Sequence, residues 1–109
     1  MGSETIRPWG SWEVIKQDTF YKIKKLIIKP DMSISEQYHN HRSETWCVVQ
    51  GTGQVFHNGK SKVVHIGDTF VVKRKEWHRV KNVSDTEDLI AIEIQMGDVC
   101  EEDDIVRKE

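Results

Sequence analysis

The sequence has few features of a membrane protein, a general nucleic-acid binder or a disulfide-stabilised secreted domain. Its apolar runs are short, as at Leu26–Ile28, and fall far below the length of a membrane span. With 16 basic and 18 acidic residues the net charge is −2, which argues against general nucleic-acid binding. Cys47 and Cys100 lie far apart without a paired spacing, so we expect reduced thiols, one of them buried in a strand. Residues 1–4 show no signal-peptide pattern, and we expect a cytoplasmic protein.

Helical signals are also nearly absent, and the 109 residues suit one domain with one core. Apolar residues come in short β-branched and aromatic runs that turn residues separate. These runs are Trp12–Ile15, Tyr21–Ile28, Trp46–Val49, Val63–Ile66, Thr69–Val72 and Leu89–Ile94. Asn58-Gly59 is a hairpin signal, because both central positions of a type I′ turn favour positive φ. Regular short strands with such turns predict an all-β sandwich or barrel.

The stretch QYHNHRSETW, residues 37–46, concentrates residues that bind metals. Alternation along a strand would place Gln37, His39 and His41 on one face. In one register His39 and His41 form the ligand pair, followed by Glu44. In the other register Gln37 and His39 form the pair, and His41 lies in the bend between two strands. The residues alone leave both registers open.

The spacing around this stretch resembles the first motif of the cupin family. That motif is a glycine, five residues, His-x-His, three or four residues, a glutamate, six residues and a glycine. Here five residues separate Asp31 from Gln37–His39, four more lead to Glu44, and six more lead to Gly51. The resemblance therefore selects the register with Gln37 and His39.

The second cupin motif has a counterpart in the second half of the chain. It is a glycine, five residues, Pro-x-Gly, two residues, a histidine, three residues and an asparagine. Here it runs from Gly67 through Lys73–Lys75 to His78 and Asn82. The resemblance implies one divalent metal ion, zinc first and iron, manganese, nickel or cobalt as alternatives. The implied ligands are Gln37, His39, Glu44 and His78. The alternative is a cupin that has lost its metal and keeps these side chains as barrel lining.

Several stretches resemble one subgroup, the cupin of type II phosphomannose isomerases. They are RPWGSWEV, QYHNHRSETW, GTGQV, IEIQMGD and EEDDIVR, in the order of that family and across nearly the whole chain. The resemblance implies a single-domain cupin over residues 1–109, an RmlC-like jelly-roll β-barrel with its core at about 21–96. An N-terminal strand and an acidic C-terminal tail flank that core. The implied reaction interconverts mannose 6-phosphate and fructose 6-phosphate through an enediol, and a homodimer is expected. In larger relatives this cupin follows a nucleotidyltransferase domain that makes GDP-mannose, so only the isomerase half is expected here.

The sequence departs from the family pattern around the pocket. Asp31 stands where the family has a turn glycine, and Val99–Glu101 stands where it usually has Tyr-Leu-Gly. Lys73–Lys75 replaces Pro-x-Gly, and we expect no residue there suited to positive φ. We therefore expect a rebuilt rim. Its cationic residues either attract an anionic substrate or form a solvated turn.

Roles beyond the ligands are less determined. Arg42 is a candidate to hold a phosphate or hydroxyl group, since its guanidinium offers a planar fork of donors, and a surface ion pair is the alternative. Glu93 and Gln95 alternate with apolar residues, so either set can face inward. The resemblance favours Glu93 as a base and Gln95 as a substrate ligand. His41 is the other candidate base, with a solvent-facing histidine as its alternative.

Two rival functions start from the same residues. Without Gln37, the remaining His39, Glu44 and His78 form the two-histidine, one-carboxylate set of non-haem iron oxygenases. A small cupin with an altered rim is alternatively a non-catalytic domain that binds a sugar phosphate. In each case the expected partner is a small molecule, with no nucleic acid and no membrane.

Overall fold

The computed structural model describes residues 4–98 and 100–108, and these form eleven strands without a helix. The strands are β1 (Thr5–Arg7), β2 (Gly10–Gln17), β3 (Tyr21–Ile28), β4 (Gln37–Tyr38), β5 (Arg42–Gln50), β6 (Gly53–His57), β7 (Lys60–Val64), β8 (Thr69–Val72), β9 (His78–Asn82), β10 (Leu89–Gly97) and β11 (Val106–Arg107). Within these residues no helix has the length and apolar character needed to cross a membrane. The prediction of an all-β fold is confirmed.

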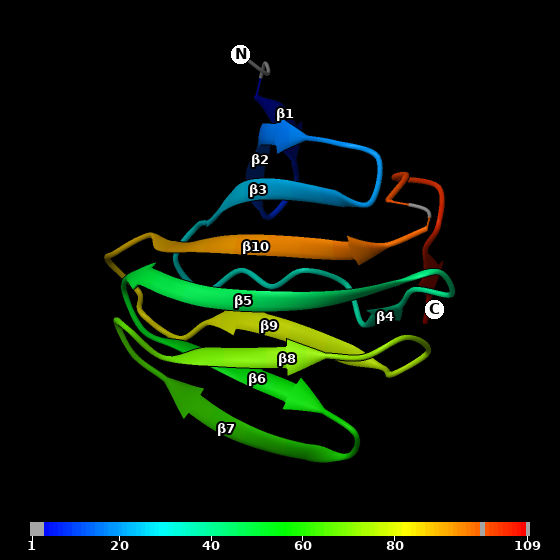
Figure 1. Cartoon of the computed structure of the whole chain (residues 1–109). Helices are drawn as coiled ribbons and strands as arrows, with labels where there is room; N and C mark the ends of the chain where they lie inside the picture. The colour runs from blue at the N-terminus through cyan, green and yellow to red at the C-terminus, as the bar shows by residue number, and fades with distance from the viewer. Residues whose placement is uncertain (1–3, 99, 109) are drawn as a thin grey trace.

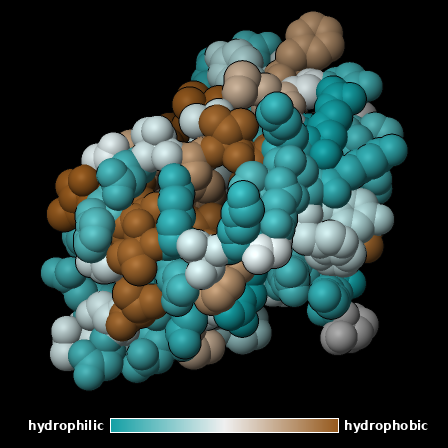
Figure 2. Space-filling view, turned by 90° about the horizontal axis from the view of Figure 1, so that it is seen from below, coloured by the Kyte–Doolittle hydropathy of each residue, from teal (hydrophilic) through white to brown (hydrophobic). Residues whose placement is uncertain are grey.

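The strands form two antiparallel sheets that enclose one core (Figure 1). The first sheet has the order β1-β2-β3-β10-β5-β8, and the second has the order β11-β4-β9-β6-β7. Both sheets supply the apolar core: the first gives Ile28, Trp46 and Leu89, for example, and the second gives Val55 and Val80. The face shown in Figure 2 is mostly hydrophilic, with hydrophobic side chains gathered on one part of it.

The interior is apolar at one end and polar at the other. On β3, β10 and β5, every second residue faces inward along most of the strand, and each strand changes from apolar to polar towards the same end of the sheet. The apolar ends are formed by Leu26, Ile28, Trp46, Val48, Leu89 and Ala91, and the polar ends by Lys22, Lys24, Arg42, Glu44, Glu93 and Gln95. Burying so many polar groups is unfavourable unless they are paired or bind something, so the polar end is the place to look for a site.

The predicted strands differ from the observed ones in detail. The hairpin at Asn58-Gly59 joins β6 to β7, with φ of 53° and 76° at its two central residues, as predicted. The run Val63–Ile66 ends as a strand at Val64, and Ile66 is 68% exposed. Strand β9 was not among the predicted runs. Both cysteines are free, but the buried one is Cys100, outside any strand, whereas Cys47 in β5 is half-buried.

Two family glycines are replaced by residues that keep the left-handed backbone conformation. Asp31 has φ of 63° and Lys75 has φ of 65°. The expectation that Lys73–Lys75 holds no residue at positive φ was therefore wrong. The turn keeps its shape because it is fixed to the barrel: the Lys75 N–H donates to the His39 carbonyl oxygen at 2.7 Å. A non-glycine residue in this region is strained, so the contact with His39 is made at a cost to stability.

Candidate metal centre

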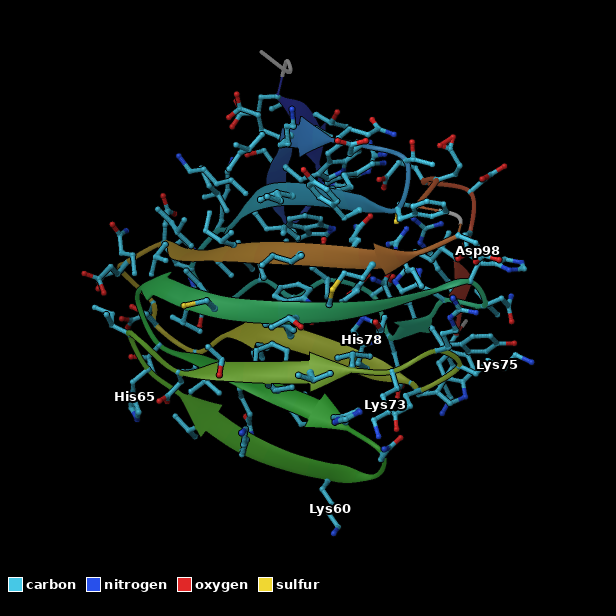
Figure 3. All side chains as sticks on the ribbon, viewed as in Figure 1. Lys60, His65, Lys73, Lys75, His78 and Asp98 are labelled. Atoms are coloured by element: carbon cyan, nitrogen blue, oxygen red, sulfur yellow. The ribbon has the colours of Figure 1, made fainter. Side chains whose placement is uncertain are left out.

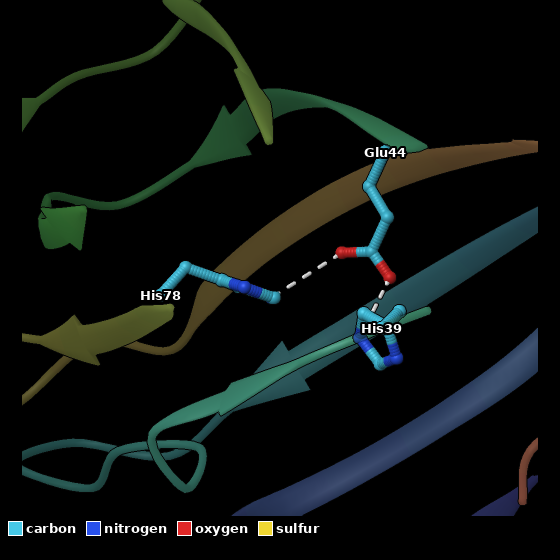
Figure 4. Close-up of side chains that lie close together, drawn as sticks. All are labelled: His39, Glu44 and His78. Atoms are coloured by element: carbon cyan, nitrogen blue, oxygen red, sulfur yellow. Dashed lines mark ion pairs between the residues drawn. The ribbon is translucent and has the colours of Figure 1, made fainter. Parts of the chain in front are cut away.

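Three side chains from separate parts of the chain converge at the polar end of the barrel. His39 directly follows β4, Glu44 is in β5, and His78 is the first residue of β9. Glu44 Oε2 lies 3.1 Å from His39 Nε2, and Glu44 Oε1 lies 3.4 Å from His78 Nε2 (Figure 4). All three residues are buried, and one ligand atom from each lies within 4.8 Å of the others. Figure 3 shows His78 between the two sheets, whereas Lys60 and His65 extend away from the barrel.

Hydrogen bonds on the far side of each imidazole ring orient the two histidines. His39 Nδ1 donates to the carbonyl oxygen of Asp104 at 2.5 Å, and His78 Nδ1 donates to that of Glu76 at 3.2 Å. A carbonyl oxygen only accepts, so in a neutral ring the lone pair is on Nε2, which faces Glu44. Among the described residues His78 Nε2 has no hydrogen-bond partner although it is buried. Two lone pairs facing one carboxylate fit a divalent cation, and two imidazoles with a carboxylate suit zinc or iron.

Glu44 is held in place by further donors. Trp46 Nε1 donates to Oε1 at 3.0 Å, and Arg42 Nε donates to Oε2 at 3.0 Å. Burial alone would raise the pKa of Glu44, but the adjacent side chains of His39 and His78 outweigh it and hold the pKa well below its ordinary value. Glu44 is therefore ionised, as a metal ligand must be.

Arg42 lies inside the protein, not on its surface. Its side chain is 4% exposed, and besides Glu44 it contacts His39 Nε2 at 3.3 Å and the Glu101 carbonyl oxygen at 3.0 Å. Most of its donors are thus directed at the candidate ligands and the C-terminal segment. The structure brings Arg42 to the site, in direct contact with two of the metal-binding residues.

Gln37 belongs to the same inner face. It pairs with His78 across β4 and β9, so both side chains point to the same side of the sheet. Its Oε1 accepts a hydrogen bond from Ser35 Oγ at 3.1 Å, and its side chain lines the cavity described below. The register with Gln37 and His39 is the one that the fold adopts.

Glu93 and Gln95 face inward, which resolves the two registers of β10. Their exposed fractions are 3% and 0%, and Gln95 Nε2 donates to Glu93 Oε1 at 2.9 Å. In the described chain Gln95 Oε1 is buried without a partner. Burial first, and then the charge of Glu44, raise the pKa of Glu93 well above its ordinary value. A protonated Glu93 next to an ionised Glu44 is the arrangement expected of two carboxyl groups in one low-dielectric site.

His41 is the predicted site residue that the fold does not bring to the centre. Strand β4 ends at Tyr38, so the alternation that would carry His41 inward stops before it. The His41 side chain is exposed, and its backbone N–H donates to the Asp104 carboxylate at 2.9 Å. The structure therefore gives no support to His41 as the base.

A cavity of about 340 Å³ opens beside the candidate metal centre, of whose three residues His39 lines it. Its lining includes His39, Arg42 and Glu93, together with Lys24 and Glu102. A volume of this size is at the lower end of the roughly 300–1,000 Å³ typical of small-molecule sites. Lys24 and Glu102 were not among the predicted site residues. The alternation of Lys22 and Lys24 with Ile23 is nevertheless the pattern of two side chains on one face of a strand.

The two flanking regions take different positions. Asp104 of the C-terminal segment caps the bend before β5, since its carboxylate also accepts from the Asn40 N–H at 3.0 Å. The cationic turn Lys73–Lys75 is exposed, and its Arg74 forms an exposed ion pair with Asp98 at 3.4 Å (Figure 3). It is not part of the cavity lining, so the solvated-turn alternative describes it better.

Comparison with known proteins agrees with the motif spacing. The family model described as mannose-6-phosphate isomerase C-terminal matches residues 1–109. The chain belongs to this family. It is 37% identical over 105 residues to mannose-1-phosphate guanylyltransferase 2 of Escherichia coli O157:H7, covering 96% of the chain. It is 36% identical over its whole length to mannose-1-phosphate guanylyltransferase ManC of Salmonella typhimurium. The chain spans 22% of the length of each of these relatives.

Solved structures with low sequence identity share the fold. KdgF from Halomonas sp. superposes with a TM-score of 0.82 at 16% identity, covering 93% of this chain and 89% of that one. An RmlC-like cupin from Shewanella frigidimarina gives a TM-score of 0.80 at 18% identity, covering 94% and 87%. The predicted cupin fold is confirmed, and the chain is a cupin domain related to the C-terminal part of the guanylyltransferases.

Proposed function

We propose that this cupin domain isomerises a hexose phosphate, interconverting mannose 6-phosphate and fructose 6-phosphate. Two adjoining features carry the proposal. His39, Glu44 and His78 converge, with His78 Nε2 buried and without a partner among the described residues, and the cavity beside them is lined by the buried Glu93. The match to a family described as mannose-6-phosphate isomerase C-terminal supports the choice of substrate.

The reaction moves a proton between two carbon atoms next to a carbonyl group. A divalent ion, which we propose to be zinc held by His39, Glu44 and His78 with Gln37 as a fourth ligand, supplies Lewis acidity to the substrate oxygens when bound. Arg42 orients Glu44 through the hydrogen bond from Nε to Oε2 and through the ion pair of its terminal guanidinium nitrogen with the same oxygen. The backbone carbonyl oxygens that accept from Nδ1 of His39 and His78 keep both Nε2 atoms directed at one point.

Glu93 is the group we propose to carry the proton between C2 and C1 of the open-chain sugar. A carboxyl group whose pKa is raised, here by burial and then by the charge of Glu44, is suited to this task, because it accepts a proton more readily than an exposed carboxylate does. Gln95 fixes one oxygen of Glu93 through its amide N–H. Its own Oε1, which is buried without a partner among the described residues, is available to a substrate hydroxyl group.

The test is anaerobic turnover of mannose 6-phosphate by the zinc-loaded protein, alongside Glu93→Gln. We expect turnover without oxygen, and a loss of roughly 10²–10⁴-fold in kcat for the variant, the usual contribution of a positioned acid–base group. Isothermal titration with zinc checks that the variant still binds the metal. Oxygen consumption with an Fe(II)-loaded protein, and no anaerobic turnover, would refute the isomerase and favour the oxygenase.

A further inference from the structure

Two lysine side chains are buried in the polar end of the barrel, where lysine is rarely found without a partner. Lys22 and Lys24 are both 4% exposed and project inward from β3. Their only anionic partner in the described chain is Glu102, whose carboxylate lies 3.2 Å from Lys22 Nζ and 3.0 Å from Lys24 Nζ. The Glu102 side chain is 40% exposed, so the pair of cations is buried but the anion reaches solvent.

The charges around the two lysines leave an excess of positive charge. Glu44 is already paired with Arg42, and within the described residues Glu102 supplies the one carboxylate in ion-pair distance of Lys22 and Lys24. Lys24 Nζ lies 3.8 Å from the centre of the Trp12 ring, a cation–π contact that holds it in position without neutralising it. Thus two cations face one carboxylate.

Glu102 is not part of the barrel. It lies on the C-terminal segment after β10, 78 residues beyond Lys24, and Asp104 and β11 fix the rest of that segment to the bend before β5 and to β4. In Figure 1 this segment lies at one end of the barrel, beside β4. Burial alone would raise the pKa of Glu102, but the charges and hydrogen bonds of Lys24 and Lys22 hold it below its ordinary value.

We propose that Lys22 and Lys24 form the subsite for the phosphate group of the ligand, and that Glu102 holds this subsite until the phosphate displaces it. The sugar-phosphate part of this inference rests on the proposed function. A phosphate accepts hydrogen bonds from the same donors as a carboxylate and carries more charge, so it suits two ammonium groups better than Glu102 does. Lys24 and Glu102 both line the cavity that contains His39 and Glu93, so a phosphate bound here leaves the sugar in the same cavity. Arg42 is less suited to the phosphate, because its donors are directed at Glu44, His39 and Glu101.

The first test measures binding by titration calorimetry with the zinc-loaded protein, using mannose 6-phosphate and inorganic phosphate as probes and uncharged mannose as the comparison. Glu102→Gln removes the competing charge, and we expect it to tighten both phosphate probes by about fivefold, because an internal competitor lowers the fraction of sites open to ligand. Glu101→Gln is the matched control, the same change one residue earlier on an exposed side chain, and it should leave affinity unchanged. Equal affinities in Glu102→Gln and the wild type, or weaker binding in Glu102→Gln, would overturn the inference.

The second test removes one lysine charge. We expect Lys24→Gln to weaken mannose 6-phosphate binding by at least ~10-fold, the effect of losing one charge-assisted hydrogen bond, and Lys24→Arg to retain most of it. Thermal unfolding shows whether each variant is folded, and the Glu102→Gln result stands if Lys24→Gln is not. Binding needs no turnover, so the two proposals fail separately. If the variants change phosphate affinity as described but the protein has no isomerase activity, the phosphate subsite is supported and the proposed isomerase function is not. If the protein turns over mannose 6-phosphate but none of the variants changes phosphate affinity, the subsite is overturned and the isomerase function stands.

Discussion

His78→Ala should remove most of the stabilisation that zinc gives to the folded protein. Its Nε2 is one of two buried side-chain atoms without a hydrogen-bond partner in residues 4–98 and 100–108, and it faces Glu44 at 3.4 Å. Losing an outer-shell partner of a metal ligand costs roughly 10–100-fold in affinity, so losing the ligand itself should cost at least ~100-fold. At a zinc concentration ~100 times the wild-type Kd, binding stabilises the wild type by about 2.7 kcal/mol. The variant, with its Kd near that concentration, would gain about 0.4 kcal/mol.

The assay is thermal unfolding of each protein with and without zinc, which removes the cost of the mutation itself from the comparison. The difference of about 2.3 kcal/mol corresponds to roughly 10 °C in Tm for a domain of this size. His65→Ala is the control, because His65 is exposed and extends away from the barrel (Figure 3). A zinc-induced shift in His78→Ala as large as that of the wild type would refute the assignment of His78 as a ligand.

Two further perturbations test the surroundings of the site. Lys75→Gly should raise the free energy of unfolding by about 0.5–1 kcal/mol in urea titrations, because the left-handed strain that glycine removes outweighs the entropy that it adds to the unfolded chain. Lys73→Gly is the control: Lys73 is not in the left-handed region, so this change should lower the free energy of unfolding. Glu76 has its pKa lowered to about 2, first by the Asn58 side chain and then by the Lys73 N–H. This group therefore stabilises the fold above its ordinary pKa of 4.5, and the contribution is lost as pH falls towards 2. Glu76→Gln should flatten the decline of stability over that range, and an unchanged acid limb would contradict the role of Glu76.

The three converging residues could be predicted because their spacing in the sequence follows the positions of strand ends. His39 follows the end of β4, Glu44 is the third residue of β5 and His78 begins β9, so a motif that records residue spacings records their positions. The inner face of β10 could not be predicted in this way. Its alternation offered Ile92 and Ile94 as an apolar face, yet Ile94 is 37% exposed and Glu93 is buried. Hydrophobicity favours the wrong face here, because this end of the interior is built for a polar site.

Lys22 and Lys24 illustrate a second limit of the sequence. Taken alone, lysines in a strand indicate a solvent-facing side. Their burial depends on a carboxylate 78 to 80 residues further along the chain, at the end of a segment that composition alone describes as an acidic tail. Only the fold brings the lysines and this carboxylate together. The fold also forms the cavity that joins the proposed anion subsite to the metal centre.

The most direct test of the central claim is exchange of the C2 proton of mannose 6-phosphate with solvent, followed by NMR in D₂O under anaerobic conditions with the zinc-loaded protein. Proton transfer through an enediol predicts deuterium at C2 of recovered mannose 6-phosphate and at C1 of fructose 6-phosphate, with neither in His78→Ala. A wild-type protein that binds zinc and mannose 6-phosphate but leaves the C2 proton in place would contradict the account.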